Sequence, residues 1–597
     1  MALLRILATT DIHMRLLPYD YFRGEPARTG SLARAATVIS GLRQGAPGSV
    51  LLDNGDFLQG TPLADAILRR VKLDPKDPNP VIQAMNVMGY DAASLGNHDF
   101  NYGLSYLRHA AGQARFPMLA ANLRVTKGPG FGGVAWLKRR LPVADGRVPE
   151  VKIAVIGLTP PQTADWDRDL ARFIHCDDMI DTAREIVPQL RDQGADVVIA
   201  LAHSGIGASE HRPRMENAAA VLAHMAQIDA VIAGHSHAVL PPAGDVTVAS
   251  GAAPLVMPGY GGSHVGVIDL RLAASPDGRL RVDAASARCV AVTQAARPAA
   301  TVTQITKAAH RQTVRDLARV VGHCATPLNS FFSTLGHDAG LRLVNMAQRW
   351  HLRHSLRGTA GAGLPVLSAA APFRAGGRGG PDHYTHVQPG AITNRDLADL
   401  YSFPNRFAAL ILTGAQLREW LERAAGMFHQ ITPGAVDSPL CDTDFPAYNF
   451  DVIEGVTWSI DLSQPAQFTV SGDRIGGPGR VRGLRWNGAE IDPDQRFAVA
   501  TNSFRLARYG LYADLVDRAQ IIVEDGESMP DLLARYFRRR RRIAVPEMAH
   551  WLFRPMPGTS VVVRSSPDSA AHRDGLPVPL DDLGRQPDGF QHYRLTL

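Results

Sequence analysis

The sequence predicts an α/β protein of two domains, and three observations carry that prediction. The chain has 597 residues, which is more than one ordinary domain holds. Hydrophobic residues make up 45% of it and charged residues 20%, a balance typical of globular domains with large cores. Short apolar runs alternate with stretches of helical periodicity over residues 1 to about 295, which is the pattern of a layered sheet covered by helices.

Five apolar runs in the first 240 residues are predicted to be buried strands, because each is short and bounded by polar residues. They are residues 3–8, 50–52, 92–95, 197–201 and 230–233. Helices are expected over residues 30–44, after the first run, and over 179–192, before the fourth. Residues 298–320 have apolar side chains at helical spacing, and we expect them to form a helix that connects the two domains.

The second half of the chain has strand and helix signals of its own. Strands are expected over residues 364–368, 408–414 and 497–501, and a helix over 415–425. The expected organisation is therefore a first domain over residues 1–297, the connecting helix over 298–320, and a second domain over 321–597. Residues 538–542 are five consecutive arginines, which we interpret as a solvated helix face rather than a nucleic-acid contact.

Charge and cysteine content exclude several classes of protein. The net charge of +6 is small for this length and does not indicate a nucleic-acid partner. The four cysteines are far apart without a Cys-x-x-Cys pair, so neither a disulfide framework nor a zinc site is expected. No apolar stretch has the length of a signal peptide or a membrane span. We expect a cytoplasmic protein as written, a periplasmic one if a leader has been removed, and no membrane partner.

Each of the five predicted strands is followed by a short polar cluster. The clusters are residues 10–13, 54–56, 96–99, 202–204 and 234–237. Functional groups collect at the carboxyl ends of strands, because these ends lie along one edge of an α/β sheet. Aspartate, asparagine and histidine supply the mixed oxygen and nitrogen donors that suit two neighbouring divalent transition-metal ions. The pattern therefore predicts a dimetal phosphoesterase centre.

The clusters differ in how specific they are. A single pair such as Asp11 and His13 is also explained by a turn or a helix cap. His235 and His237, two residues apart after an apolar run, are harder to explain structurally. Asp56 is the candidate for a carboxylate that bridges two cations and reduces their repulsion. His98 is the candidate for a group that donates to a phosphate oxygen or protonates the departing ribose oxygen.

The ordered clusters resemble the calcineurin-like metallophosphoesterases, and residues 52–62 and 96–103 resemble the 5'-nucleotidase superfamily. Longer strings at 156–162, 257–259, 365–373, 398–405 and 448–455 are similar to one branch of it, the bifunctional 2',3'-cyclic-nucleotide 2'-phosphodiesterase/3'-nucleotidases. The resemblance implies a four-layer α/β/β/α metallophosphoesterase domain, followed by a C-terminal α/β domain of the 5'-nucleotidase type.

The resemblance also implies two divalent metal ions, and the donors suit Mn, Zn, Co or Fe. One ion would be bound by Asp11, His13, Asp56 and His237. The other would be bound by Asp56, Asn97, His203 and His235.

His98 stands at the position of the family's catalytic histidine. Asn101 stands where 5'-nucleotidases have the aspartate that orients this histidine. Asparagine can hold an imidazole by a hydrogen bond, but it cannot stabilise an imidazolium as a carboxylate would. This departure favours the cyclic-phosphodiesterase branch.

Substrate contacts in the second domain are likewise implied by the resemblance. Phe403 and Phe504 occupy the positions of two aromatic rings that hold the nucleobase by stacking, although two core phenylalanines would give the same pattern. Arg374 and Arg378 lie in a Gly-rich loop where relatives place basic substrate contacts. Solvated loop arginines are the alternative for these two. Small-molecule nucleotides are the expected partners.

The implied activity is hydrolysis of 2',3'-cyclic nucleotides to 3'-nucleotides, and of these to nucleoside and phosphate. A 5'-nucleotidase or nucleotide-sugar hydrolase shares every metal ligand, and Asn101 argues against it. A nuclease is disfavoured by the aromatic pair and the modest charge, so no stable nucleic-acid partner is expected. A catalytically inactive nucleotide-binding protein is the alternative of another class. The oligomeric state has no signal in the sequence.

Overall fold

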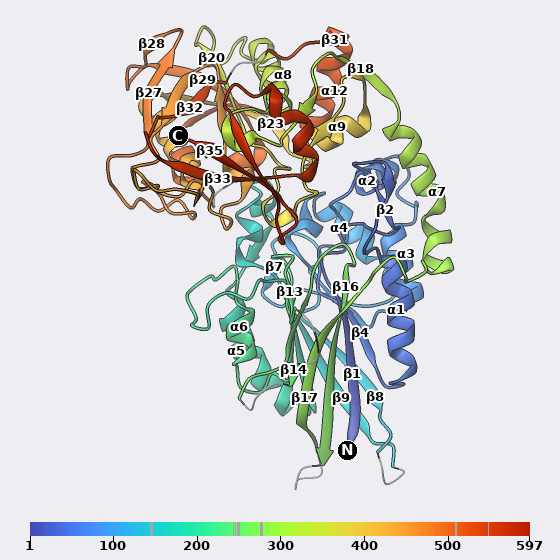
Figure 1. Cartoon of the computed structure of the whole chain (residues 1–597). Coiled ribbons are helices and arrows are strands. Elements are labelled where there is room, and N and C mark those ends of the chain that lie inside the picture. Colours follow the sequence, from blue (N-terminus) through green and yellow to red (C-terminus); the bar gives the residue numbers. More distant parts are fainter. Residues whose placement is uncertain are drawn as a thin grey trace. The chain divides into compact units, whose positions relative to one another are not determined.

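The computed structural model describes residues 1–143, 147–242, 244, 246–247, 251–274, 279–507, 510–546 and 549–597 (Figure 1). Contacts divide the chain into two compact units, Met1–Asp316 and Leu317–Leu597. Both units combine helices and sheets, so the predicted α/β class is confirmed.

Two sheets lie at the centre of the N-terminal unit. The first has the strand order β14-β17-β16-β1-β4-β5-β6 and the second β13-β15-β12-β11-β9-β8. The first sheet consists of β1 (Ala2–Thr9), β4 (Val50–Asp53), β5 (Ala92–Ser94), β6 (Met118–Leu119), β14 (Val246–Thr247), β16 (His264–Ala274) and β17 (Leu280–Ala291). The second consists of β8 (Val134–Arg140), β9 (Glu150–Leu158), β11 (Val197–Ala202), β12 (Ala230–Ile232), β13 (Val239–Leu240) and β15 (Leu255–Pro258).

The two sheets pack face to face, because side chains from both form one buried apolar cluster. Ile6 and Leu52 belong to it from the first sheet, and Ile199 and Ile232 from the second. A second cluster joins the other face of the second sheet to α5 (Met179–Asp192) and α6 (Ala219–Ala223). On the outer face of the first sheet lies α1 (Leu32–Gln44) (Figure 1). The four-layer α/β/β/α arrangement implied by the resemblance is thereby confirmed.

The five predicted strands are β1, β4, β5, β11 and β12. Within the first sheet β1, β4 and β5 run parallel, and within the second β11 runs parallel to β9 and β12. The residues of β4, β5, β11 and β12 are buried on both faces, which explains why these runs are continuously apolar rather than alternating. Parallel strands place their carboxyl ends at one edge of each sheet, and the polar clusters follow these ends.

The helices of the N-terminal unit begin where the sequence supplies caps. Ser31 accepts a hydrogen bond from the N–H of Arg34 at the start of α1, and Asp178 accepts two at the start of α5. The remaining helices are α2 (Pro62–Leu73), α3 (Pro80–Met88) and α4 (Leu104–Ala111). A helix also occupies the predicted connection, as α7 (Ala300–Leu317). His310 of α7 bonds to Tyr21 in the same unit, with 2.9 Å between Nδ1 and the phenol oxygen.

A five-stranded sheet of order β25-β20-β29-β23-β30 forms the centre of the C-terminal unit. Its strands are β20 (Val366–Ala370), β23 (Arg406–Thr413), β25 (Val452–Glu454), β29 (Arg496–Asn502) and β30 (Gln520–Ser528). The helices of this unit are α8 (Ala339–Ser355), α9 (Asn394–Leu400), α10 (Gly414–Ala424), α11 (Ala513–Asp517) and α12 (Met529–Arg540).

Four smaller sheets complete the described part of the C-terminal unit, and one of them contains only β19 (Leu328–Asn329) and β21 (His386–Val387). Of the other three, the first contains β18 (Val320–Cys324), β22 (Gly390–Thr393) and β31 (Arg542–Ile543). The second contains β24 (Ser438–Pro439), β33 (Ser560–Ser565), β34 (Leu580–Arg585) and β35 (Gln591–Thr596). The third contains β26 (Thr457–Ile460), β27 (Val481–Trp486), β28 (Ala489–Glu490) and β32 (Trp551–Phe553).

The arginine run differs from its prediction. Only its first three members lie on α12, which ends at Arg540. Arg541 leaves the helix with φ of 60°, and Arg542 begins β31. The helix therefore ends earlier than the side-chain pattern alone indicates, because the chain must turn into a strand. All five arginines are exposed.

All four cysteines are free thiols, of which Cys176 and Cys324 are buried and Cys289 and Cys441 half-buried. None of the described helices combines the length and the apolar character that a membrane-spanning segment needs.

Candidate metal centre

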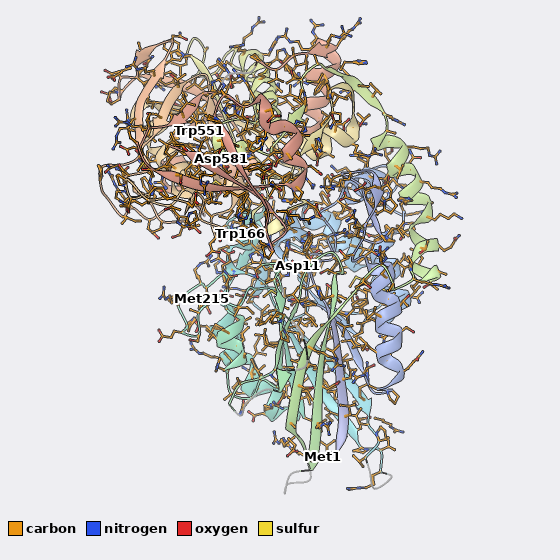
Figure 2. The ribbon with its side chains drawn as sticks, viewed as in Figure 1. Met1, Asp11, Trp166, Met215, Trp551 and Asp581 are labelled. Atoms are coloured by element: carbon orange, nitrogen blue, oxygen red, sulfur yellow. The ribbon has the colours of Figure 1, made fainter. Side chains whose placement is uncertain are left out.

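The loops that follow β1, β4 and β5 are joined into one structure by backbone hydrogen bonds. The N–H of Asp11 donates to the carbonyl of Gly55 at 2.9 Å, and that of His13 to the carbonyl of Asp56 at 2.8 Å. The buried carboxylate of Asp99 ties in the third loop. It accepts four backbone N–H groups, those of Asp56, Phe57, Leu58 and Gly96. Asp11 marks this end of the N-terminal unit in Figure 2.

Five of the expected metal ligands have a backbone in the left-handed region. Their φ angles are 50° at Asp11, 47° at His13, 61° at Asp56, 67° at His235 and 60° at His237. A residue other than glycine pays about 1–3 kcal/mol for a strained conformation of this kind, so the surrounding structure must hold it in place. The joined loops hold Asp11, His13 and Asp56, and Oδ2 of Asp11 accepts the backbone N–H of His235 at 3.1 Å. These contacts indicate that the strand ends are shaped for a site rather than for simple turns.

Two glycines allow the loops to approach closely. A Cβ at Gly96 would lie 2.2 Å from Oδ1 of Asp56 and 2.6 Å from Cε1 of His203. At Gly234 it would lie 2.8 Å from Oδ2 of Asp11. A side chain at either position would push an expected ligand out of place.

Asp11, His13 and His237 form one group of possible metal ligands. Each offers an atom within 4.8 Å of the others. Oδ1 of Asp11 lies 3.4 Å from Nε2 of His237 and 3.8 Å from Nε2 of His13. The two Nε2 atoms are 3.1 Å apart. These are the residues expected for the first ion, together with Asp56.

Asp56, His203 and His235 form the second group. Oδ2 of Asp56 lies 3.0 Å from Nε2 of His203, and Oδ1 of Asn97 lies 3.0 Å from Nδ1 of His235. The same Oδ2 of Asp56 is 4.0 Å from Nε2 of His13 in the first group. Asp56 thus faces both groups, as a bridging carboxylate would.

Unpaired polar atoms show that these residues fit divalent cations. Oδ1 of Asp11, Oδ2 of Asp56 and Nε2 of His203 are buried, and although the last two lie 3.0 Å apart, none of the three makes a hydrogen bond of suitable geometry among the described residues. Buried polar groups normally form hydrogen bonds, so three buried polar atoms without one at the same place need an explanation. Carboxylate oxygen and imidazole nitrogen are ligands that divalent transition metals accept, and such an ion would satisfy all three atoms.

The electrostatics of the cluster favour positive charge. Burial raises the pKa of Asp11, but His203 and His237 outweigh it and bring the value down to about 2. Asp56 behaves in the same way, and its pKa falls well below the usual range. Burial lowers the pKa of His203, yet Asp56 and Asp11 raise it to about 10. Burial and His237 lower the pKa of His13 to about 4, which leaves a nitrogen lone pair available for a metal.

His98 lies beside the two groups. Its backbone N–H donates to Oδ1 of Asp56 at 2.7 Å, and its Nδ1 lies 2.7 Å from Oδ1 of Asn101. An amide oxygen only accepts hydrogen bonds, so Nδ1 carries the proton and Nε2 is left for a substrate. The contact with Asn101 has the geometry expected of an orienting residue, and the roles of both residues stay predictions.

Several residues around the centre have no signal in the sequence. The ring of Trp166 stacks on His235 with centroids 5.6 Å apart, and that of Tyr260 on His237 at 4.8 Å. Glu216 contacts His235 as well. Trp166 and Tyr260 come from loops that do not follow a predicted strand, and Glu216 lies in the loop after β11 but beyond the polar cluster at 202–204. Asp99 is different, because it lies within a predicted polar cluster and its acidic side chain could have been considered there.

The two residues that are expected to contact the base lie beside the ends of two neighbouring strands of the five-stranded sheet. Phe403 lies just before β23 begins and Phe504 just after β29 ends, and these antiparallel strands pair Phe407 with Asn502. Both phenylalanines are half-buried. They therefore lie at the same end of two neighbouring strands, and their role in stacking stays a prediction.

Phe504 is anchored by a buried ion pair. Arg505, which follows it, forms two hydrogen bonds with the carboxylate of Asp451, at 2.7 and 2.9 Å. The guanidinium also bonds to the carbonyl of Tyr448, whose ring meets that of Phe504 edge to face at 5.9 Å. The string 448–455, noted for its resemblance, thus supports the position of Phe504.

The two arginines expected near the substrate differ in what can be said of them. Arg374 is buried, with its Nε 2.9 Å from a carboxylate oxygen of Asp399. Arg378 lies on a short 3₁₀ turn, Gly377–Gly379, and its side chain is outside the described part of the structure. A substrate contact of either residue stays a prediction.

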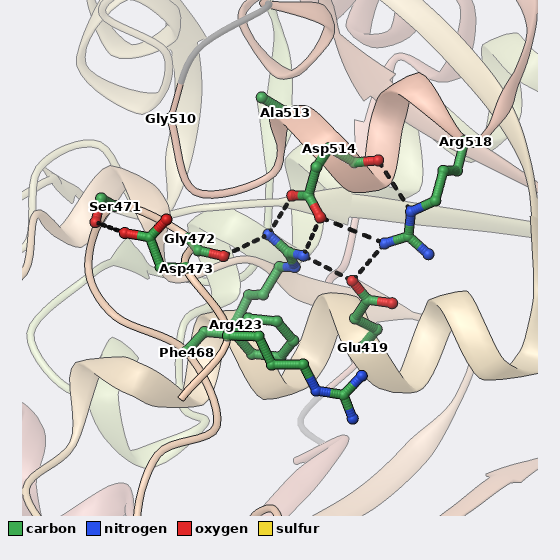
Figure 3. A pocket seen from close by; sticks show the side chains of 11 residues that line it. Glu419, Arg423, Phe468, Ser471, Gly472, Asp473, Gly510, Ala513, Asp514 and Arg518 are labelled. Atoms are coloured by element: carbon green, nitrogen blue, oxygen red, sulfur yellow. Dashed lines mark hydrogen bonds and ion pairs between the residues drawn. The ribbon is translucent and has the colours of Figure 1, made fainter. Parts of the chain in front are cut away.

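A cavity of about 530 Å³ lies elsewhere in the C-terminal unit (Figure 3). Four of its six charged side chains form one network of ion pairs. Arg423 contacts Glu419 at 2.6 Å and Asp514 at 2.7 Å, and Arg518 contacts Glu419 at 2.6 Å. Arg423 also covers the ring of Phe468 at 4.3 Å. This network stabilises the walls of the cavity, and the charges of its four members compensate one another.

Comparison with known proteins agrees with this geometry. Residues 4–239 match the model of the calcineurin-like phosphoesterases, and residues 321–514 match that of the 5'-nucleotidase C-terminal domain. A solved structure of a putative 5'-nucleotidase from Staphylococcus aureus has the same fold. It covers 92% of this chain and 99% of its own, with a TM-score of 0.72 at 21% identity.

Two curated relatives are similar over most of the chain. The trifunctional nucleotide phosphoesterase protein YfkN of Bacillus subtilis is 35% identical over 94% of this chain, which spans 40% of the length of YfkN. The 2',3'-cyclic-nucleotide 2'-phosphodiesterase/3'-nucleotidase of Salmonella typhimurium is 36% identical over 84% of this chain and 81% of its own length. Because relatives of this identity are matched over most of the chain and both family models are present, this chain belongs to the 2',3'-cyclic-nucleotide 2'-phosphodiesterase/3'-nucleotidase family.

Proposed function

We propose that this chain hydrolyses 2',3'-cyclic nucleotides to 3'-nucleotides, and then 3'-nucleotides to nucleoside and phosphate. The similarity to the Salmonella protein over both domains is the observation that carries this proposal. The convergence of every expected metal ligand on the strand ends of the N-terminal unit supports it.

Two divalent cations belong to the proposal. Asp11, His13 and His237 would hold one, Asn97, His203 and His235 the other, and Asp56 would contact both. Bound there, the ions supply a polarised phosphate and a water that loses its proton near neutral pH. The donor set suits Mn, Zn, Co or Fe.

His98 has the role of a proton donor in this scheme. In the first reaction a water oxygen forms a bond to phosphorus and the bond from phosphorus to the 2' oxygen breaks. The departing oxygen needs a proton, and Nε2 of a protonated His98 would give it. Asn101 holds the ring through Nδ1, so that Nε2 keeps its direction. In the second reaction water attacks the phosphorus of the 3'-phosphate and the bond from phosphorus to the 3' oxygen breaks. His98 would again give the departing oxygen its proton.

The C-terminal unit contributes recognition of the base. Phe403 and Phe504 each offer an aromatic face, and stacking needs no particular hydrogen-bond pattern. We therefore expect several bases to be accepted.

Product analysis with 2',3'-cyclic AMP tests the proposal. The protein loaded with Mn²⁺ should release 3'-AMP first and adenosine later, and chromatography separates all three compounds. Accumulation of 2'-AMP would contradict the proposed cleavage of the bond to the 2' oxygen. Absence of any product would contradict the proposal that the chain hydrolyses cyclic nucleotides. Faster hydrolysis of 5'-AMP than of 3'-AMP would instead identify a 5'-nucleotidase.

His98→Ala is the matched variant in this experiment. It should bind Mn²⁺ as the wild type does, because His98 belongs to neither ligand group, and it should lose at least about 10²-fold in rate because the leaving oxygen has no proton donor. Equal rates for the variant and the wild type would remove His98 from the mechanism.

A further inference from the structure

His235 is held from two sides by polar partners. Its Nδ1 lies 3.0 Å from Oδ1 of Asn97, another expected ligand of the second ion. Its Nε2 lies 2.9 Å from Oε1 of Glu216. Nδ1 is therefore the nitrogen that faces the ion position, and Nε2 points away from it.

Two other expected histidine ligands, His13 and His203, show what is unusual about the contact between His235 and Glu216. Nδ1 of His13 lies 2.7 Å from the carbonyl oxygen of Gln59, and Nδ1 of His203 lies 2.7 Å from that of Asn54. Both of these partners are uncharged backbone groups. In His235 the nitrogen that faces away from the ion position is Nε2, and its partner is a carboxylate. The second ligand group therefore includes a histidine whose outer nitrogen has a charged partner.

Glu216 is fixed in place by its own segment, which connects β11 to α6. The hydroxyl of Ser204, next to the expected ligand His203, donates to the carbonyl of Glu216 at 2.9 Å and accepts from the N–H of Ala218 at 2.7 Å. Met215, the residue before Glu216, and Trp166, which stacks on His235, are labelled in Figure 2. The carboxylate thus approaches His235 from a rigid backbone.

We propose that Glu216 is a positioning residue for the second ion site, which is formed by Asp56, Asn97, His203 and His235. The hydrogen bond keeps the proton of His235 on Nε2, so that the lone pair of Nδ1 is directed at the ion. A carboxylate partner also makes the imidazole a stronger ligand, and loss of such a partner commonly weakens metal binding 10–100-fold. The inference depends on the ion sites of the proposed function but not on its substrate.

Titration of metal-free protein with Mn²⁺ tests the inference. Calorimetry measures the Kd of each ion, and the exchange-coupled electron paramagnetic resonance signal reports when two neighbouring ions are bound. The wild type should bind two Mn²⁺. Glu216→Ala should bind one with unchanged Kd and the other 10–100-fold more weakly. Glu216→Gln keeps an oxygen acceptor without the charge, and about a tenfold weakening of the same ion is expected.

Glu210→Gln is the control, because Glu210 is an exposed carboxylate in the same segment. It should bind both ions as the wild type does. Excess Mn²⁺ should restore the coupled signal in both Glu216 variants, which a folding defect would not allow.

Equal weakening of both ions, unchanged binding of both, or failure of excess Mn²⁺ to restore the signal would each overturn the inference. A wild type that binds fewer than two ions would overturn it together with the proposed ion sites. If the wild type binds two ions and the Glu216 variants weaken one, but cyclic nucleotides are not hydrolysed, the proposed function fails and the role of Glu216 stands.

Discussion

The two units build their functional residues in different ways. In the N-terminal unit five of the seven expected ligands have a left-handed backbone, and the polar atoms of the set converge on one place. In the C-terminal unit Phe403 and Phe504 are half-buried rings beside the strand ends, and only the latter is anchored by a buried ion pair.

This difference corresponds to the tolerance that each task allows. A metal ion needs its donor atoms within a few tenths of an ångström, and rigid, strained loops provide that precision. Stacking needs only an aromatic face at the right height, which a less constrained loop can offer. Changes in the N-terminal cluster should therefore abolish turnover, whereas changes in the C-terminal residues should weaken binding.

Asp56→Asn should have the largest effect, because it removes a carboxylate that faces both ligand groups. We expect kcat to fall by about 10³-fold, the scale for loss of a key electrostatic contact, together with loss of bound metal. Phosphate release and metal analysis of purified protein measure the two effects. Asp283→Asn, an exposed change in β17, is the control and should alter neither. Full activity of Asp56→Asn would contradict the assignment of the chemistry to the N-terminal cluster.

Asp451→Ala should destabilise the C-terminal unit by about 3 kcal/mol, because Arg505 is left buried without its partner. Its carboxylate also accepts the indole N–H of Trp420 at 2.9 Å. Thermal unfolding measures the loss, and KM for nucleotides should rise because Phe504 loses its anchor. Asp494→Ala, at an exposed position, serves as the reference. A variant with unchanged stability and KM would mean that the ion pair does not support Phe504.

Gly96→Ala should displace Asp56 and His203, since the added methyl group has no room beside them. Overpacking of this kind costs about 2 kcal/mol, and bound metal should be lost. Gly41→Ala in α1 adds the same methyl group where nothing lies within 4 Å, and it should keep both stability and metal. Metal content equal in the two variants would show that the close approach of the loops is not needed.

Phe504→Ala should have the smallest effect, a rise of about tenfold in KM for 2',3'-cyclic AMP at unchanged kcat, which is the scale of one stacked base. Steady-state kinetics separate the two constants. A fall in kcat without a change in KM would place Phe504 in the chemistry rather than in recognition.

Much of the fold and the centre of the site could be predicted from the sequence. Strands buried on both faces are continuous apolar runs, and α5 occupies exactly the predicted residues 179–192 because its cap and its periodicity agree. The polar clusters mark the strand ends, so Asp11, Asp56 and His203 could be placed together before the structure was known.

The rest depends on tertiary structure that no local pattern encodes. Glu216 and Trp166 contact His235 from loops distant in sequence. The arginine run ends outside its helix because Arg541 turns the chain toward β31, and no helical periodicity reports such a turn. Contacts between loops are fixed by how the two sheets pack, which one sequence alone does not specify.

The central claim is that the N-terminal cluster carries the chemistry and the C-terminal aromatic pair carries recognition of the base. Hydrolysis of bis(p-nitrophenyl) phosphate, which has no nucleobase, compared with 2',3'-cyclic AMP tests it most directly. A variant with both Phe403→Ala and Phe504→Ala should lose about 100-fold in kcat/KM for the nucleotide and keep its activity on the nitrophenyl ester, while Asp56→Asn loses both. Equal losses on the two substrates in the double phenylalanine variant would contradict the account.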